Sequence, residues 1–300
     1  MDEAGFIAAL RALPLHPGAR GLVDDTATIA GLTITTDTLV EGVHFLAADL
    51  PADVAWKLVA TNLSDLAATG ARVEGITLNY PLSRGEWDAA FLVGLDAALR
   101  AFGCALLGGD TVTLPLDAPR ILTVTAFGSD APAPPRSGAR PGDALWVTGT
   151  IGDACAGLAL ALAGGGGDAL LAAYHRPVPR LAEGRLLAPR VHAMMDVSDG
   201  LLIDAARMAA ASDLALAIAL DRVPLSPSYA AMRGRDRQAR LAAATAGDDY
   251  ELLFAAAPDA TLPVAATRIG TFAAGTGLTL SDADGAIPLP EKLGFQHGLP

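Results

Sequence analysis

Apolar residues follow regular spacings along the first half of the chain. The run LTITT from Leu32 alternates β-branched residues and predicts a strand that ends at Asp37. Residues 53–69 place apolar side chains at helical spacing, and Gly70 follows as a C-terminal stop. The same reasoning predicts further strands at 73–80, 104–108 and 120–128 and a second helix at 86–102. The first half therefore predicts a βαβαββ-type sheet domain with acidic residues at its strand ends.

A break in this pattern separates the two halves of the chain. Residues 129–143 are rich in Pro, Gly and Ala, as a linker would be, so we expect an N-terminal domain at 1–130 and a C-terminal domain at 131–300. Beyond the break, the spacing predicts strands at 144–149, 214–220 and 250–256 and helices at 153–163, 180–187 and 201–211, with short strands and turns over the last thirty residues. The expected class is α/β (α+β), with a C-terminal α/β sandwich domain.

Composition indicates which classes of protein this chain can belong to. A content of 52% hydrophobic and 18% charged residues over 300 positions is typical of a folded globular chain. The net charge of −12 and the absence of Lys/Arg clusters argue against nucleic-acid binding. Because the apolar stretch at 154–163 is too short to cross a bilayer and the N-terminus lacks a basic signal region, we expect a soluble protein with no membrane association. The two cysteines, Cys104 and Cys155, fit reduced thiols and a cytoplasmic location.

Aspartate is the residue type that points to chemistry. The chain holds 26 Asp against 7 Glu, and its only lysines are Lys57 and Lys292. No segment reads GxxxxGK[ST], which excludes a P-loop enzyme. Short carboxylates beside small residues suit Mg²⁺, which prefers oxygen ligands. The acids gather in six clusters: Asp24-Asp25, TTDT at 35–38, NLSD at 62–65, GGDT at 108–111, DVSDG at 196–200 and GDDYE at 247–251. We therefore expect a site that handles phosphate through divalent metals.

Three of these clusters have a predicted structural setting. DVSDG precedes the helix at 201–211, so a carboxylate, a hydroxyl and free backbone N–H groups are expected to meet at a helix N-terminus. In GGDT, two glycines allow a ligand to approach the backbone closely. Asn62 and Asp65 are three residues apart and share a helix face. The structural alternative remains open at each position, because Asp is common at turns and as a helix N-cap.

Taken in order, these segments resemble the thiamine-monophosphate kinase family, whose superfamily also contains aminoimidazole ribonucleotide synthetase and a hydrogenase maturation protein. The resemblance spans about residues 24 to 254 and is specific as an ordered set. Its motifs are DDTATI, TTDTLVEGVHF, NLSDLAATGA, LLGGDT, RSGARPGD, VTGTIGD, HRPVPR, MDVSDGL and AGDDYELLF.

The resemblance implies ATP-dependent phosphorylation of thiamine monophosphate to thiamine diphosphate by a homodimer, with several Mg²⁺ ions as cofactors. The metal ligands that it implies are Asp25, Thr35, Thr36, Asp37, Asp65, Asp110, Asp196 and Asp199. It implies ATP contacts at Gly109, Asp110, Arg136 and Ser198. Substrate contacts are implied at His44, Asp248 and Phe295.

The acceptor of this reaction is a phosphate that is already ionised, so we expect alignment and charge neutralisation to matter more than a general base. The expected course is direct in-line transfer, with no catalytic side chain beyond those that position and hold metal. Two positions depart from the family pattern: Val23 replaces a common glycine and Asp248 a frequent glutamate. The alternatives are another ATP-dependent synthetase of the superfamily, similar to aminoimidazole ribonucleotide synthetase, and a non-catalytic nucleotide-binding module.

Overall fold

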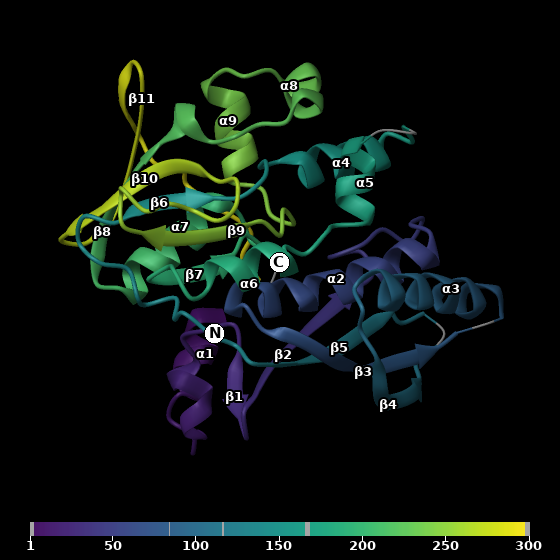
Figure 1. Ribbon diagram of the computed structural model, residues 1–300. Coiled ribbons are helices and arrows are strands. Elements are labelled where there is room, and N and C mark those ends of the chain that lie inside the picture. Colours follow the sequence, from purple (N-terminus) through teal and green to yellow (C-terminus); the bar gives the residue numbers. More distant parts are fainter. Residues whose placement is uncertain (1–2, 84, 116, 166–168, 298–300) are drawn as a thin grey trace.

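The computed structural model describes residues 3–83, 85–115, 117–165 and 169–297, which form two β-sheets with helices between and around them (Figure 1). This arrangement confirms the predicted mixed α/β class. In the described part of the chain, no helix is long and apolar enough to span a membrane.

The N-terminal half contains a five-stranded sheet with the order β1-β2-β5-β3-β4. Its elements are α1 (Glu3–Leu10), the 3-10 helix η1 (Pro17–Leu22), β1 (Ala27–Ile29), β2 (Leu32–Val40), α2 (Pro51–Thr69), β3 (Arg72–Leu82), α3 (Glu86–Ala101), β4 (Leu106–Thr113) and β5 (Ile121–Ser129). Strands β3 and β4 run parallel, whereas β5 pairs antiparallel with both β2 and β3.

The C-terminal half contains a seven-stranded sheet with the order β12-β11-β8-β10-β6-β9-β7. Its strands are β6 (Ala144–Val147), β7 (Ala193–Asp196), β8 (Leu214–Ala219), β9 (Leu252–Ala256), β10 (Thr267–Ala274), β11 (Gly277–Asp282) and β12 (Gly285–Ile287). Its helices are α4 (Asp153–Leu162), α5 (Ala169–His175), α6 (Leu181–Leu187), α7 (Leu201–Ala211), the 3-10 helix η2 (Leu220–Arg222), α8 (Pro227–Arg233) and α9 (Arg237–Ala244).

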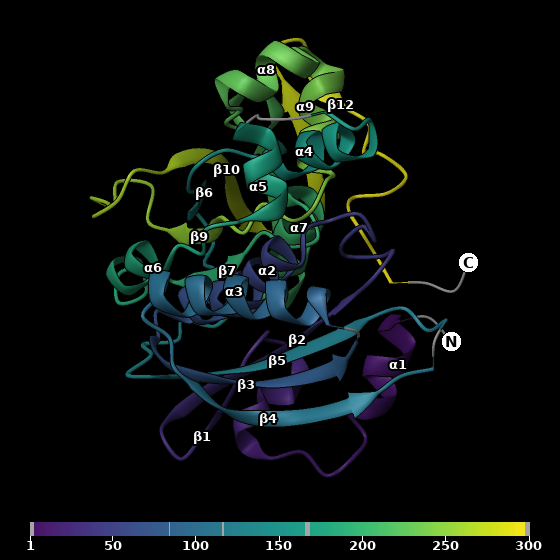
Figure 2. The same ribbon diagram turned by 90° about the vertical axis from the view of Figure 1, so that its right-hand side faces the viewer.

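Helix α2 lies between the two halves of the molecule. One side packs on β2 and β5, and the other contacts α6 and β7 of the C-terminal half (Figures 1 and 2). As a result, 16 of its 19 residues are buried, including the polar Lys57, Asn62, Ser64 and Asp65. Burying a polar group is costly unless it has a partner, so these side chains must face one another or a ligand. The helix ends as predicted at Gly70, whose φ of 66° favours glycine.

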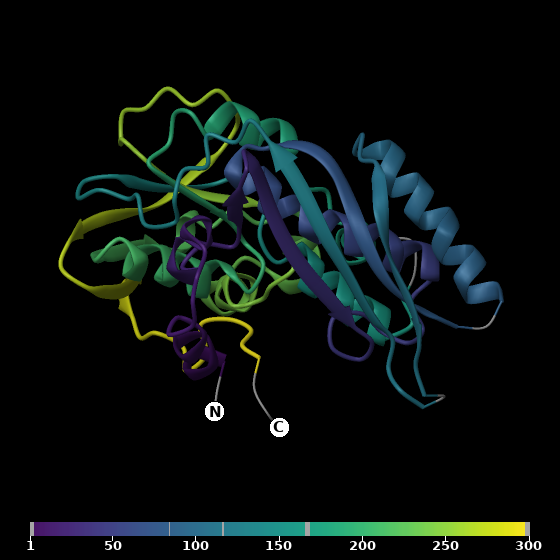
Figure 3. The same ribbon diagram turned by 90° about the horizontal axis from the view of Figure 1, so that it is seen from below.

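The N-terminal sheet has one covered and one open face. Along β5, Leu122, Val124 and Ala126 are buried against the helices. The alternate residues Thr123 and Thr125 face the other way, where their hydroxyls pair with Thr38 and Thr36 of β2 at 2.8 Å and 2.9 Å in exposed positions. Figure 3, seen from below, shows the strands on this side in front of the helices. A row of hydroxyls therefore runs along the open face.

The prediction of local structure needs one correction and several additions. The strand predicted at 104–108 is displaced: β4 covers Leu106–Thr113, so GGDT lies inside a strand instead of after its end. This edge strand tolerates glycine because every one of its residues is exposed. Strands β1, β7 and β10 and helices α1, α5, α8 and α9 were not predicted, since their short segments carry too few turns of periodic spacing. Of the remaining predicted elements, α7 has its predicted bounds, and the others are present with shifted ends.

Candidate phosphoryl-transfer site

A cavity of about 1240 Å³ lies between the two halves of the molecule. Its walls come from residues far apart in sequence: the loop before β1, strand β2, helix α2, the turn between β7 and α7, the loop before β9 and the C-terminal segment near Phe295. Its lining includes Asp24, Asp25, Asp37, Asp65, Asp196, Asp199 and Asp248, against the cationic Arg136, Arg207 and Lys292. An anionic substrate would be repelled from such a surface without added cations.

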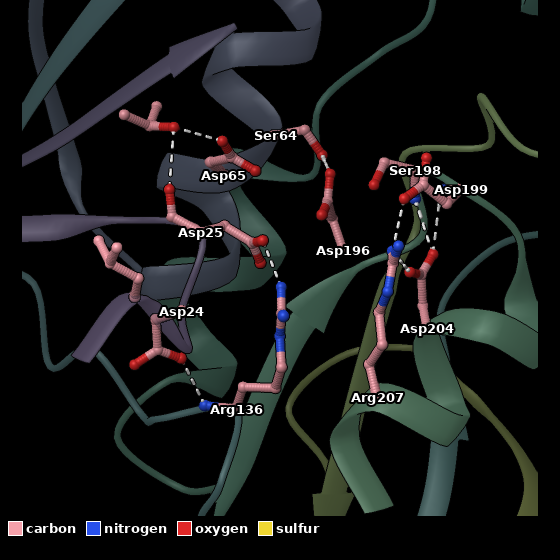
Figure 4. Close-up of polar contacts among 12 residues, drawn as sticks. Asp24, Asp25, Ser64, Asp65, Arg136, Asp196, Ser198, Asp199, Asp204 and Arg207 are labelled. Carbon is pink, nitrogen blue, oxygen red and sulfur yellow. Dashed lines mark hydrogen bonds and ion pairs between the residues drawn. The ribbon is translucent and has the colours of Figure 1, made fainter. Parts of the chain in front are cut away.

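Three carboxylates meet at one end of this cavity. Asp25 from the loop before β1, Asp65 from α2 and Asp196 from the end of β7 offer oxygens that all lie within 4.8 Å of one another (Figure 4). Asp65 and Asp196 are buried, whereas Asp25 is exposed. The cluster is thus assembled from both halves of the chain.

Neighbouring side chains hold these acids in place. Thr35 donates its hydroxyl to the Asp65 carboxylate, and Ser64 donates to Asp196 at 2.6 Å. Asn62 accepts the backbone N–H of Asp37 at 3.0 Å, which joins α2 to β2. Asn62 and Asp65 therefore face the same strand, as their spacing of three predicted.

Electrostatics at this end are unfavourable without a bound cation. Burial, aided by the carboxylates of Asp25 and Asp199, raises the pKa of Asp37 to about 6. Burial raises the pKa of Asp65 and of Asp196 well above the usual aspartate range, and adjacent carboxylates add to both shifts. Among the described residues, no ion pair reaches Asp37, Asp65 or Asp196, although Asp25 has Arg136 and Asp199 has Arg207. Hard oxygen donors crowded in this way fit a divalent cation such as Mg²⁺.

Arg136 borders the same acids. Its guanidinium contacts the Asp25 carboxylate, and its backbone N–H donates to Asp24 at 2.9 Å (Figure 4). Within the described chain its buried Nε has no hydrogen-bond partner. The side chain lines the cavity, so it keeps donor capacity for an anionic ligand.

The start of α7 differs from the prediction of free backbone N–H groups. Asp204, one turn into the helix, accepts the N–H groups of Ser198, Asp199 and Gly200 at 3.1 to 3.2 Å. Its carboxylate also pairs with Arg207 at 2.9 Å, and burial raises the pKa of Asp204 to about 7. These three backbone donors of the turn before α7 are therefore already used, and Ser198 and Asp199 reach the cavity through their remaining atoms.

The implied substrate contacts lie together in another part of the cavity wall. His44 accepts the Val40 N–H through Nδ1 at 3.0 Å, so the neutral ring carries its proton on Nε2. Burial and then His297 lower the pKa of His44, which favours that neutral form. The His297 ring lies 5.5 Å from His44 and 5.0 Å from Phe295, centroid to centroid.

Asp248 is fixed in the same region by its backbone and side chain. Its φ of 69° is left-handed, and its N–H donates to the Ser198 carbonyl at 2.7 Å. A Cβ at the preceding Gly247 would lie 2.3 Å from that carbonyl, so this close approach requires glycine. The Asp248 carboxylate accepts from Tyr250 Oη at 2.8 Å and from Lys57 Nζ at 2.6 Å.

Three implied residues are not brought to the acidic cluster within one chain. The Thr36 hydroxyl pairs with Thr125 on the open face of the sheet, opposite to Thr35. Gly109 and Asp110 lie on β4 and do not line the cavity. In the strand register, Asp37 aligns with Val124, Val124 with Leu78 and Leu78 with Gly109, which puts Gly109 about 14 Å from Asp37 at three strand spacings.

Several residues at the site were not singled out from sequence. Lys57 looked like part of an apolar helix, and Ser64, Arg207 and His297 carried no recognisable spacing. Asp204 offered a signal, because a carboxylate in the first turn of a helix after DVSDG is placed to accept backbone N–H groups.

Family models match most of the chain. Residues 23–129 match the N-terminal domain of AIR synthase related protein, and residues 140–283 match its C-terminal domain. The chain therefore belongs to the AIR synthase related class of two-domain proteins, in agreement with the two sheets and the cavity between them.

Curated relatives indicate the family within this class to which the chain belongs. The chain is 38% identical over 307 residues to thiamine-monophosphate kinase of Caulobacter vibrioides, covering 94% of this chain and 86% of the relative. It is 38% identical over 247 residues to the Escherichia coli K12 enzyme of the same name, covering 78% and 75%. The chain is a member of the thiamine-monophosphate kinase family.

Solved structures agree with this placement. Thiamine-monophosphate kinase from Stenotrophomonas maltophilia K279a is 38% identical with a TM-score of 0.77, covering 92% of this chain and 94% of that one. AaThiL complexed with AMPPCP and TMP is 29% identical with a TM-score of 0.84, covering 98% and 96%. Hydrogenase maturation protein HypE in complex with ATP, 19% identical with a TM-score of 0.71, shares the fold.

Proposed function

We propose that this protein transfers the γ-phosphoryl group of ATP to the phosphate of thiamine monophosphate, giving thiamine diphosphate and ADP. The observation that carries the proposal is the carboxylate cluster of Asp25, Asp65 and Asp196 in a cavity that also holds His44 and Asp248. The family named above and the relative complexed with AMPPCP and TMP support it. One end suits a metal-bound polyphosphate and the other suits an organic ring.

The acidic end would hold Mg²⁺ through Asp25, Asp37, Asp65 and Asp196, with Thr35 and Asp199 beside them. Mg²⁺, when bound, neutralises phosphate charge and orients phosphate oxygens. Arg136 would bind an ATP phosphate through its free donors, and Ser198 would contact the nucleotide from the β7–α7 turn.

No side chain is needed as a general base in this reaction. An oxygen of the acceptor phosphate is already ionised, so it attacks the γ-phosphorus directly while the bond to the β-γ bridging oxygen of ATP breaks. The protein's part is to align the two phosphates and to exclude water. His44, neutral with its proton on Nε2, would donate a hydrogen bond to the acceptor, and Phe295 would pack on its ring.

Direct transfer predicts inversion at phosphorus. A chiral thiophosphate version of ATP, followed by analysis of the product, measures the outcome. Retention would mean a phospho-enzyme intermediate and would overturn the in-line course.

Gly109 and Asp110 enter this proposal through a second copy of the chain. They lie about 14 Å from Asp37 along the sheet of their own chain, too far to share a metal ion with it. The outer edge of β4 has no strand beside it in the described chain, and β1 covers β2 only from Leu32 to Ile34. A homodimer that joins the edge of β4 to the uncovered edge of β2 would bring Asp110 to its partner's acidic cluster.

The first experiment is a chromatographic assay of the purified protein with ATP, Mg²⁺ and thiamine monophosphate, with an EDTA control. Metal-dependent formation of thiamine diphosphate is expected. ATP binding without this product would favour the alternatives, and a screen of other phosphate acceptors would then separate a sister synthetase from a non-catalytic module.

Mixing inactive variants tests the dimer. If Asp110 serves the partner's site, an equal mixture of reassociated Asp65→Asn and Asp110→Asn chains regains about a quarter of wild-type activity, because half the dimers then hold one intact site. If Asp110 serves its own chain, the mixture stays inactive. Light scattering of the same samples gives the oligomeric state.

A further inference from the structure

The single lysine of the N-terminal half is almost fully buried. Lys57 lies on α2 with 2% of its surface exposed, and it does not line the cavity. A buried ammonium group is unfavourable unless its donors are satisfied. The contacts of this buried ammonium group must therefore offset the cost of its burial between the two halves of the molecule.

The ammonium group of Lys57 has three specific partners. Nζ donates to the Asp248 carboxylate at 2.6 Å and to the His44 carbonyl at 3.0 Å. It also lies 4.5 Å from the centre of the Tyr174 ring, a cation–π contact. Because this ammonium is buried and Lys57 does not line the cavity, it offers no donor to a phosphate there. Direct contact with substrate is thereby excluded for Lys57 in this conformation.

The two residues that Lys57 holds are those assigned to the acceptor. His44 belongs to the loop after β2, and Asp248 belongs to the loop before β9 in the other half of the chain. Lys57 joins them through one atom, because it fixes the backbone at His44 and the side chain of Asp248. The remaining oxygen of Asp248 is fixed by Tyr250.

We propose that Lys57 is a positioning residue for the acceptor subsite, setting the orientation of Asp248 and His44 and neutralising the charge of Asp248 before substrate arrives. The inference rests on the proposed function, since it concerns how thiamine monophosphate is bound. It distinguishes Asp248 from the buried Asp65 and Asp196 of the metal end, which no ion pair reaches among the described residues.

The test compares Lys57→Met with Arg176→Met. Arg176, which follows α5, forms another ion pair between the two halves of the molecule: it pairs at 2.5 Å with Asp53 of α2, the helix that carries Lys57. Arg176 does not line the cavity. Lys57→Met is expected to raise KM for thiamine monophosphate at least about tenfold, the effect of losing a charge-assisted contact, with KM for ATP within about twofold. Arg176→Met is expected to leave both KM values near wild type while lowering thermal stability.

A double-mutant cycle with Asp248→Asn shows whether Lys57 acts through Asp248. Lys57→Met is expected to change the KM and the calorimetric affinity for thiamine monophosphate much less in the Asp248→Asn background than in wild type, because only the contact of Lys57 with the His44 carbonyl is then left to lose. Fully multiplied effects of the two substitutions, or a KM for ATP that rises as much as the KM for thiamine monophosphate, would overturn the inference.

The double variant also guards against misfolding, because it removes both charges together. If Lys57→Met keeps the wild-type KM for thiamine monophosphate while the wild-type enzyme makes thiamine diphosphate, this inference is wrong and the proposed function stands. A wild-type protein that neither binds thiamine monophosphate nor phosphorylates it sinks the proposed function and this inference with it.

Discussion

The two ends of the cavity treat carboxylates in opposite ways. At one end Asp65 and Asp196 are buried beside other acids, and in the described chain no ion pair reaches them. At the other end Asp248 is paired with Lys57 and accepts a hydrogen bond from Tyr250. Both arrangements use aspartate. In the first, neighbouring carboxylates repel one another, and a divalent cation would relieve this repulsion. In the second, the lysine already neutralises the carboxylate.

This difference assigns a chemical task to each end. A cluster whose carboxylates repel one another gains most from a bound metal, because the metal supplies the missing positive charge. A neutralised carboxylate with fixed oxygens is suited to an uncharged hydrogen-bonding group of a ring and attracts no further cation. The metal end can thus bind the phosphates, and the end with Asp248 can bind the heterocycle, before phosphoryl transfer begins.

The largest expected effect comes from the metal end. Asp65→Asn should lower kcat by about 10³-fold, the scale seen when one preorganised charge-stabilising group is lost. The same variant should have a higher melting temperature than wild type in EDTA, because a buried repulsion is removed. Steady-state assays and scanning calorimetry measure the two effects.

Asp96→Asn is the matched control for that variant. Asp96 is exposed on α3 and pairs with Arg100, so its loss should change neither activity nor the response to EDTA. Asp65→Asn with full activity would remove Asp65 from the metal site.

The second largest effect concerns Arg136. Arg136→Met should raise KM for ATP by roughly tenfold to a hundredfold, because charged hydrogen bonds to phosphate are lost, and should leave KM for thiamine monophosphate nearly unchanged. Arg140→Met, an exposed arginine of the same connecting segment, is the control. Equal changes in both KM values would mean that Arg136 acts on the whole cavity instead of on the nucleotide.

The third effect is a pH dependence of stability in the absence of metal. The pKa of Asp37 is raised to about 6 in the folded state, and burial also raises the pKa values of Asp65 and Asp196, whereas unfolded aspartates titrate near 3.9. Between these limits the folded state binds more protons than the unfolded state. Its free energy of unfolding therefore falls as pH rises from about 4 through 6 and above.

Melting temperatures at pH 5.5 and pH 8 measure this dependence. In EDTA the value at pH 8 should be lower, and Mg²⁺ should raise it more at pH 8 than at pH 5.5, because protons and the metal compete for the same oxygens. A Mg²⁺ response that is equal at both pH values would contradict the charge-crowded picture of this end.

The smallest expected effect lies at the ring end. Phe295 is 44% exposed and its N–H donates to the Asp199 carbonyl at 2.9 Å, so the backbone stays in place when the ring is removed. Phe295→Ala should raise KM for thiamine monophosphate about fivefold, the scale of one aromatic contact, with no change in melting temperature. Phe6→Ala, an exposed phenylalanine of α1 that does not line the cavity, is the control.

Much of the fold and part of the site could be predicted from the sequence. Periodic apolar spacing located β2, α2, α3 and β5, because each buries one face against a neighbour and so carries a repeating signal. The spacing of Asn62 and Asp65 placed both on one face of α2, and the ordered motifs indicated the family. These features depend on neighbours within a few residues or on the order of segments.

Other features were decided by tertiary structure alone. Asp25, Asp65 and Asp196 come from a loop, a helix and a strand end, and only the packing of α2 between two sheets brings their oxygens together. The strand register, which no local pattern specifies, separates Asp110 from Asp37. Lys57 looked like one polar residue in an apolar helix, and its charge acquires a role because Asp248, 191 residues later, folds against it.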